Sequence, residues 1–200
     1  MSPGRRKFHR LAGVRPYRKL FVIAVEGIKT EPQYFALYNS QQSVIRVNCL
    51  KGGYASSPPQ VLKRMEKHLA IEKLRSSDEA WLVVDKDQWT DTQLAQLHNW
   101  ALKRTNYGFA LSNPKFEYWL LLHFEDGTAV STSRDCSERL KRYLPDYDKG
   151  ISADKFTTER ISAAIARARR KDNPPCPDWP QLPGGTTVYR LVERILSGKK

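Results

Sequence analysis

The chain alternates short continuous apolar runs with segments in which apolar residues recur at helical spacing. The runs have strand length and lack polar–apolar alternation, which is typical of strands covered on both faces of a sheet. The segments between them carry helix-start signals and a single apolar stripe. The predicted strands are 20–25, 44–50, 80–84 and 107–111, and the predicted helices begin near residues 30, 57, 90 and 113.

Particular residues are expected to begin these helices. Thr30 and Gln33 have the spacing of a capping box, which predicts a helix from Thr30 to about Ser40. Ser57 stands before two prolines that suit a first helical turn, and another helix is expected to begin near Thr90.

This order of elements predicts an α/β fold. Alternating strands and helices over residues 19–125 imply right-handed crossovers and a mostly parallel sheet with helices on both faces. A helical C-terminal region should follow, with helices at 133–144, 154–171 and 187–196. The expected organisation is a basic mobile arm over residues 1–18, an α/β domain over 19–125, and the helical region over 126–200 packed on it.

Charge is the strongest compositional signal. The 200 residues carry a formal net charge of +13. Such a surface attracts polyanions, and nucleic acid is the most abundant polyanion in a cell, although the charge could also serve solubility alone. Arg5 and Arg6 in the N-terminal arm are therefore candidate nucleic-acid contacts.

Composition excludes other classes of protein. No apolar run approaches the ~20 residues that a membrane-spanning helix needs, and no signal-type apolar stretch follows the basic N-terminus. The three cysteines are odd in number and far apart, so neither a disulfide framework nor a CxxC zinc site is expected. We expect a reduced, cytoplasmic protein.

Acidic residues follow the predicted strands at the positions where ligands bind. Glu26 closes the first strand and Asp85 closes the third, and parallel sheets bind ligands at the carboxyl ends of their strands. Asp85 and Asp87 are two residues apart, so in extended backbone they point to the same side. Glu117 is expected one turn into a helix that Asn113 caps and that runs to Phe124.

These acids indicate a divalent-cation site. Carboxylates gathered in one cleft repel one another without a cation, and their hard oxygens suit Mg²⁺ or Mn²⁺. Taken alone, an Asp-x-Asp pair after a strand often only solvates a loop or caps a helix. The agreement between Glu26 and the Asp85–Asp87 pair carries the argument.

Basic residues near these acids are candidate phosphate contacts. Lys115 should lie at a helix start, which favours anions. Lys51 follows the second strand in a glycine-containing loop that lacks the P-loop pattern. Lys86 points away from its neighbouring aspartates and is either structural or phosphate-facing. His123 is expected to be a packed histidine rather than a general base.

Three segments together resemble the RloB family, which is similar to the Toprim fold of topoisomerases, bacterial primases and overcoming-lysogenization-defect nucleases. They are Val25–Phe35 (VEGIKTEPQYF), Val83–Asp87 (VVDKD) and Ser112–Phe124 (SNPKFEYWLLLHF). The segment at 186–193 (TTVYRLVE) also resembles the closing segment of that family.

The resemblance implies a Toprim-like sheet with a metal site. Glu26 would be the glutamate of the first strand, Asp85 and Asp87 the paired metal-binding aspartates, and Glu117 an additional acid. The chain departs from the family at Ile28, where members often carry another acid, and Glu31 could compensate through the cleft. The resemblance further implies a role in phage defence, often beside an ATPase partner.

The expected function is therefore Mg²⁺- or Mn²⁺-dependent hydrolysis of phosphodiester bonds in DNA or RNA. Glu26, Asp85, Asp87 and Glu117 would hold the metal, and either Glu26 or Glu31 would accept the proton of the attacking water. The alternative is a non-enzymatic, basic nucleic-acid-binding adaptor that uses the same site to bind metal or a partner. A phosphatase of the Asp-x-Asp type fits less well, because its first aspartate is expected at the first strand, where this chain has Glu26.

Overall fold

The computed structural model describes residues 19–39, 44–53, 57–86, 89–147 and 150–198. The expected arm at 1–18, with Arg5 and Arg6, lies outside the described residues, as does Asp87. No helix within these ranges has the length and apolar character that crossing a membrane requires.

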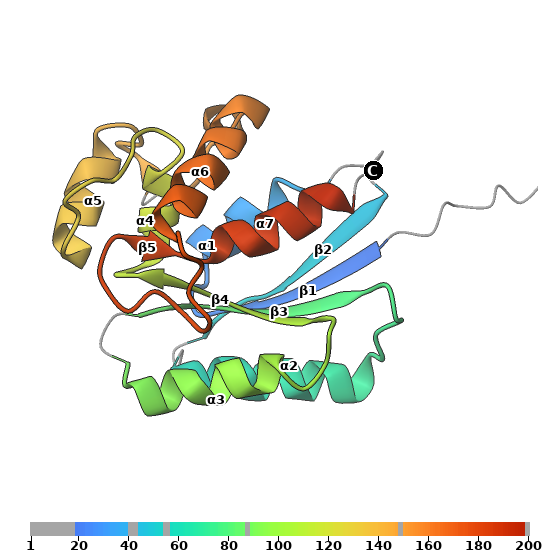
Figure 1. Ribbon diagram of the computed structural model, residues 1–200. Coiled ribbons are helices and arrows are strands. Elements are labelled where there is room, and N and C mark those ends of the chain that lie inside the picture. The colour runs from blue at the N-terminus through green and yellow to red at the C-terminus, as the bar shows by residue number, and fades with distance from the viewer. Residues whose placement is uncertain (1–18, 40–43, 54–56, 87–88, 148–149, 199–200) are drawn as a thin grey trace, which may run out of the picture.

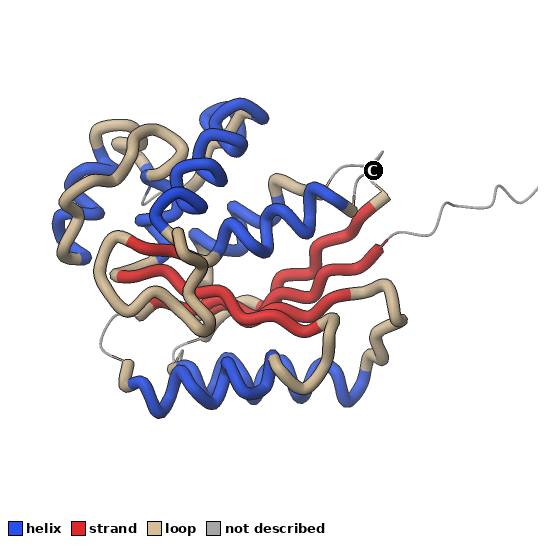
Figure 2. Tube along the Cα trace, in the orientation of Figure 1, coloured by secondary structure: helices blue, strands red, loops and turns tan. Residues whose placement is uncertain are grey.

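A five-stranded sheet in the order β2-β1-β3-β4-β5 forms the middle layer (Figures 1 and 2). Strands β1 to β4 run parallel, and the short β5 pairs antiparallel with the end of β4. The carboxyl ends of the four parallel strands therefore share one edge. The bounds are Lys19–Val25 for β1, Ile45–Leu50 for β2, Glu79–Asp85 for β3, Tyr107–Asn113 for β4 and Gly185–Thr186 for β5.

Helices cover both faces of the sheet. One face is covered by α2 (Pro58–Ile71) and α3 (Asp91–Ala101), which lie below the sheet in Figure 1. The remaining helices gather above it, with α5 beside α4 over the carboxyl edge. They are α1 (Thr30–Ala36), α4 (Phe116–Leu121), α5 (Ser133–Lys141), the 3₁₀ helix η2 (Ala153–Lys155), α6 (Thr158–Lys171) and α7 (Val188–Ser197).

Strand β1 shows how the apolar runs divide between two cores. Its side chains alternate between the faces of the sheet, as extended backbone requires. Phe21 and Ile23 join the core under α1, α4, α6 and α7, whereas Val22 and Ala24 join the core over α2 and α3. All four are fully buried, which explains why the run has no polar alternation.

The structure confirms the α/β class and the order of the predicted strands and helices through β4. Helices α2 and α3 begin after Ser57 and Thr90, each with a capping box. The expected box at Thr30 is wrong: Lys29 precedes α1, and the side chain of Gln33 instead accepts a hydrogen bond of 2.8 Å from the Ile151 amide. The Gln33 side chain is therefore engaged in a tertiary contact and does not cap α1.

The predicted start of α4 is also wrong. Asn113 is the last residue of β4, and its side-chain nitrogen donates to the carbonyl oxygens of Pro180 and Gln181 at 3.1 and 3.2 Å. Helix α4 is shorter than expected and ends at Leu121. The C-terminal region is not wholly helical either, because β5 extends the sheet beside β4.

Candidate active site

Glu26 leaves β1 at the carboxyl edge and is held by donors from the neighbouring strand and its loop. Its Oε2 accepts the backbone N–H of Asp85 at 2.7 Å, and its Oε1 accepts the indole N–H of Trp89 at 2.9 Å. Donors of this kind orient the carboxylates of metal sites from behind.

Asp85 lies between β1 and the start of α4. Its Oδ1 accepts the backbone N–H of Phe116 at 2.8 Å, and among the described residues it has no basic partner. Burial raises the pKa of Asp85 well above the ordinary value, and the nearby charges of Glu31, Glu26 and Glu117 raise it further. The Phe116 bond opposes this rise without overcoming it.

Glu31 approaches the same place from the first turn of α1. It is buried, and its Oε1 accepts the Gly27 amide at 2.8 Å. A Cβ at residue 27 would lie 2.0 Å from Glu31 Oε2, so a larger residue there would displace the carboxylate. Burial raises the pKa of Glu31, the Glu31 and Gly27 amides oppose the rise, and the charge of Glu117 adds to it.

Glu117 completes the group from the first turn of α4. Only 17% of its side chain is exposed, and Lys115 Nζ lies 3.9 Å from its Oε2. The structure therefore brings together Glu26, Glu31, Asp85 and Glu117, which we call the acidic site. Its members come from the ends of β1 and β3 and the first turns of α1 and α4.

The acidic site has the donor chemistry of a magnesium or manganese site. Carboxylate oxygens are the ligands that both ions prefer, and the described acids supply only such oxygens. Across residues 19–39, 44–53, 57–86, 89–147 and 150–198, no three His, Cys, Asp or Glu side chains are already placed to hold one metal ion together. Asp87 lies outside those ranges.

Of the predicted basic residues, three lie within the described ranges, and two of these are engaged while one is exposed. Lys115 Nζ donates to Ser137 Oγ of α5 at 2.6 Å. Lys86 Nζ binds the Trp89 carbonyl at 3.1 Å and Asp91 at 2.7 Å, which supports the structural interpretation of this residue. Lys51 is exposed directly after β2.

His123 is a packed histidine, as predicted. Its Nε2 lies 3.1 Å from the hydroxyl of Tyr34, and 2% of the residue is exposed. Burial lowers the pKa of His123 to about 3, although bonds to backbone carbonyls oppose the shift. The ring is therefore neutral near pH 7, and it is buried among aromatic side chains.

Two residues that the sequence did not indicate also contact the edge. Trp89 donates to Glu26, as described above. Arg64 of α2 reaches the ends of β1 and β2, where its Nη1 donates to the carbonyl oxygens of Val25 at 2.7 Å and Leu50 at 3.3 Å. Both roles depend on partners far away in the sequence, so no local signal marks them.

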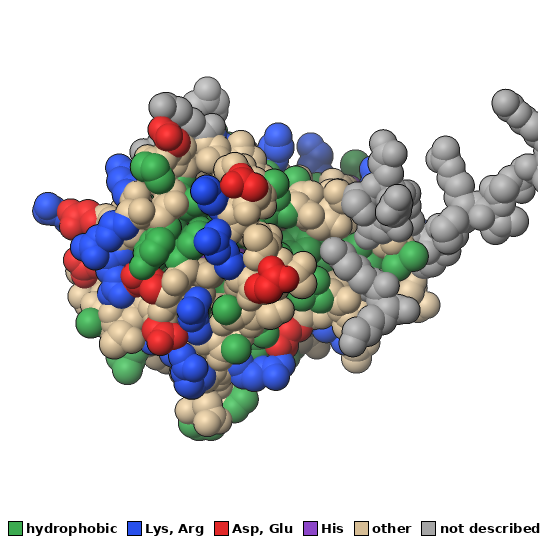
Figure 3. Space-filling view, turned by 90° about the horizontal axis from the view of Figure 1, so that it is seen from above, with side chains coloured by type: hydrophobic (Ala, Val, Ile, Leu, Met, Phe, Trp, Pro, Cys, Tyr) green, Lys and Arg blue, Asp and Glu red, His purple; other side chains and the backbone are tan. Residues whose placement is uncertain are grey.

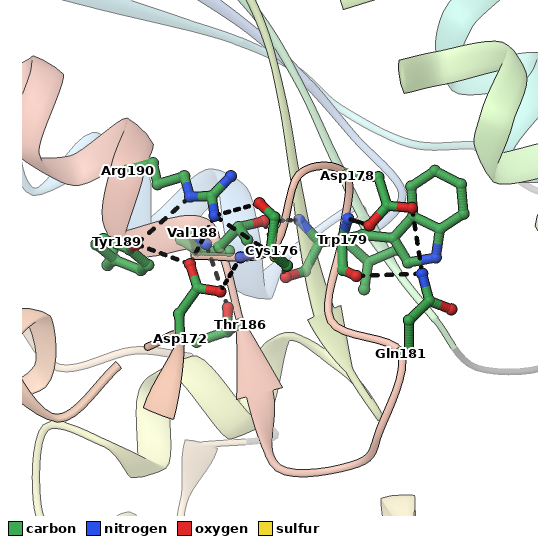
Figure 4. Close-up of polar contacts among 11 residues, drawn as sticks. Asp172, Cys176, Asp178, Trp179, Gln181, Thr186, Val188, Tyr189 and Arg190 are labelled. Carbon is green, nitrogen blue, oxygen red and sulfur yellow. Dashed lines mark hydrogen bonds and ion pairs between the residues drawn. The ribbon is translucent and has the colours of Figure 1, made fainter. Parts of the chain in front are cut away.

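A second cluster of polar and charged residues, centred on Asp172, is bonded internally. Figure 4 shows Asp172, whose carboxylate accepts the Cys176 amide at 2.8 Å, the Tyr189 hydroxyl at 2.8 Å and Arg190 Nη2 at 2.6 Å. This cluster ties the proline-rich loop to α7, and the same loop meets Asn113.

The helical face seen in Figure 3 carries Lys and Arg interspersed with Asp and Glu. A cavity of about 680 Å³ between α6 and α7 contains three arginines, each of which is paired with an acid. These pairs are Arg169 with Glu193, Arg190 with Asp172 and Arg194 with Glu79. These three arginines therefore have acidic partners, whereas Asp85 has no basic partner among the described residues.

Comparison with known proteins supplies the family. No curated protein and no solved structure matches the chain. The model of the RloB-like protein family matches residues 21–195, which include most of β1, all of β2 to β5 and every member of the acidic site. The chain therefore belongs to the RloB-like protein family.

Proposed function

We propose that the protein is a metal-dependent nuclease that hydrolyses phosphodiester bonds of DNA or RNA. The observation that carries the proposal is the position of Asp85. Its half-buried carboxylate lies near the charges of three other acids and has no basic partner in the described chain. A site built this way favours a cation brought from solution, and the net charge of +13 favours a polyanionic substrate.

In this proposal Glu26, Asp85, Asp87 and Glu117 hold Mg²⁺ or Mn²⁺, in agreement with the expectation from sequence. A bound ion of this kind stabilises charge on a phosphate and lowers the pKa of a bound water. Because no three described side chains are already placed around one point, binding would draw the carboxylates together.

The chain's own residues have separate tasks. The bonds from Asp85 N–H and Trp89 hold Glu26 in one orientation. Glu31 is the favoured acceptor for the proton of the attacking water, because burial raises its pKa toward the range in which a general base works near neutral pH. Lys115 and Lys51 are candidate contacts to the substrate backbone, as are Arg5 and Arg6.

The family suggests a biological setting. We propose that the nuclease acts in phage defence and is controlled by an ATPase encoded nearby. An isolated chain that binds nucleic acid but remains inactive until that partner is added would agree with this setting.

The test is incubation of labelled DNA and RNA with Mg²⁺ or Mn²⁺, against a chelator control. The parent should cut only with metal, Glu26→Gln should not cut, and the exposed Glu66→Gln should cut like the parent. If the parent is inactive, cleavage mapping of total RNA and phage DNA after expression with neighbouring-locus proteins is the deciding measurement. Binding without cleavage in both assays would favour the adaptor function instead.

A further inference from the structure

Arg64 joins the ends of two strands beside the acidic site. Its side chain extends from α2 to the carbonyl oxygens of Val25 and Leu50, which are the last residues of β1 and β2. Glu26 follows Val25 directly, so the guanidinium lies at the base of the first acid. Burial lowers the pKa of Arg64, while the charges of Cys49 and Glu26 oppose that shift.

The guanidinium still has donors to offer. Both carbonyl bonds come from Nη1, and within the described residues neither Nε nor Nη2 has a hydrogen-bond partner and no acid forms an ion pair with Arg64. Two other arginines direct the same nitrogens at acids. Arg194 directs both Nε and Nη2 at the Glu79 carboxylate, and Arg190 directs Nη2 at Asp172.

The loop after β2 brings backbone close to Glu26 without placing a side chain there. The Gly52 amide donates to the Gly27 carbonyl at 2.9 Å, and a Cβ at residue 52 would lie 1.6 Å from the Glu26 carbonyl oxygen. A Cβ at Gly53 would meet nothing within 4 Å, so the next position faces open space. Among the described residues, nothing therefore occupies the space next to Gly53 on this side of the edge.

We propose that Nε and Nη2 of Arg64 bind a phosphate group of the nucleic acid that occupies the acidic site. A guanidinium fork matches two phosphate oxygens, and the carbonyl bonds fix its position before the substrate arrives. The location fits because parallel sheets bind ligands at this edge. The inference rests on the proposed function and adds the residue that receives the substrate backbone on the β1–β2 side.

The experiment measures binding, so that it does not depend on turnover. A fluorescent single-stranded DNA and an RNA of the same sequence are titrated with protein in Ca²⁺ at several salt concentrations. The variants are Arg64→Gln, Arg64→Lys and the matched control Lys103→Gln. Lys103 is exposed near the opposite edge and carries the same charge.

Arg64→Gln should weaken binding about tenfold, as expected for loss of charge-assisted hydrogen bonds. It should also lower the slope of log affinity against log salt by ~1. Arg64→Lys should keep the slope and recover only part of the affinity, because an ammonium lacks the fork. Lys103→Gln should bind like the parent. Equal binding by Arg64→Gln and the parent would overturn the inference.

Arg64→Gln also removes two backbone bonds, so melting temperatures with and without Mn²⁺ are measured for every variant. If Arg64→Gln loses its Mn²⁺-induced shift together with its affinity, Arg64 acts through the acids and the inference is overturned. The two proposals fail in different ways. Arg64-dependent binding without cleavage, even after expression with the neighbouring-locus proteins, defeats only the nuclease. Glu26-dependent cleavage with Arg64-independent binding defeats only the phosphate contact.

Discussion

Strand β3 begins and ends with a carboxylate, and the surroundings of the two carboxylates shift their pKa values in opposite directions. Glu79 at the amino edge receives Lys19 at 2.7 Å, Arg194 at 2.8 Å and the Trp81 indole at 3.0 Å. Burial alone would raise its pKa, but these bonds outweigh burial and lower it. At the other end Asp85 faces acids, and its pKa is raised.

The opposite pKa shifts indicate that Glu79 stabilises the fold, whereas Asp85 belongs to the proposed functional site. Glu79 is 2% exposed and already has its counter-charges, so its contribution is to stability. Asp85 has only backbone N–H to oppose the repulsion of its neighbours, so the folded chain holds this group at a cost. Sites kept at a cost in stability are commonly functional.

Cleavage is the property in which the carboxylates at the two edges of the sheet should differ most. Glu26→Gln and Asp87→Asn should each lower the rate by about 10³-fold or more, or ~4 kcal/mol of transition-state stabilisation, because anionic ligands to the metal are lost. Glu79→Gln should cut at the parental rate at a temperature where it is folded. Normal cutting by either site variant under limiting metal would show that the assigned site is wrong.

Stability should show the reverse order. Glu79→Gln should lower the free energy of unfolding by about 2–3 kcal/mol, because charge-assisted bonds are lost and two cations are left without their partner. Urea denaturation measures this change, with the exposed Glu66→Gln expected within ~0.5 kcal/mol of the parent. An unchanged urea midpoint for Glu79→Gln would mean that the amino edge is no more tightly held than the surface.

A smaller effect of opposite sign is expected at the other end of β3. In chelator, Asp85→Asn should stabilise the protein by about 1 kcal/mol, or ~2–4 °C in melting temperature, because one charge leaves the acidic site while the bond to Phe116 is kept. Millimolar Mg²⁺ or Mn²⁺ should raise the melting temperature of the parent by mass action, and the variant should lose most of that increment.

A parent without a metal-dependent shift, together with a less stable variant in chelator, would identify Asp85 as a structural helix cap. The metal-site interpretation would then be withdrawn.

The smallest expected effect is on the pH dependence of the free energy of unfolding. Because the pKa of Glu79 is lowered in the folded protein, its contribution is present above the unfolded pKa and is lost as pH falls through the folded pKa. Asp85 acts in the opposite sense. Its raised pKa lets the folded state keep a proton that the unfolded state has released, so stability falls as pH rises above the ordinary value of 3.8 toward the folded pKa.

In unfolding measurements over this range, Asp85→Asn should abolish the fall in stability with rising pH, and Glu79→Gln should abolish the loss of stability at acid pH. Each substitution should change the slope of the free energy of unfolding against pH by at least a few tenths of a kcal/mol per pH unit. Identical profiles of stability against pH for the two variants would contradict opposite pKa shifts at Glu79 and Asp85.

The strands could be predicted because their pattern is local. The uninterrupted apolar runs of β1 and β3 mark them as buried on both faces, and Glu26 and Asp85 follow from the ends of those runs. Helix α4 was misplaced because Asn113 serves the loop at 180–181 rather than its own helix. That partnership joins positions far apart in sequence and leaves no local trace.

The acidic site was predicted only in part, because some of its contacts also join positions far apart in the sequence. Glu117 was expected one turn into a helix that Asn113 caps, yet it reaches the site from a helix that begins at Phe116. Glu31 was expected as a compensating acid or as the proton acceptor, and the bond from the Gly27 amide that holds its carboxylate is not visible in the sequence. Arg64 reaches the edge through long-range backbone contacts that spacing alone does not predict.

The hydrogen bond between Trp89 and Glu26 gives the protein a built-in optical reporter. Indole fluorescence responds to charge close to the ring, and here the indole N–H lies 2.9 Å from a carboxylate oxygen of the proposed metal site. A cation that neutralises Glu26 should therefore shift the emission of this one tryptophan among the five in the chain. A Trp89→Phe difference spectrum isolates that signal, so occupancy of the site can be followed in solution without substrate or label.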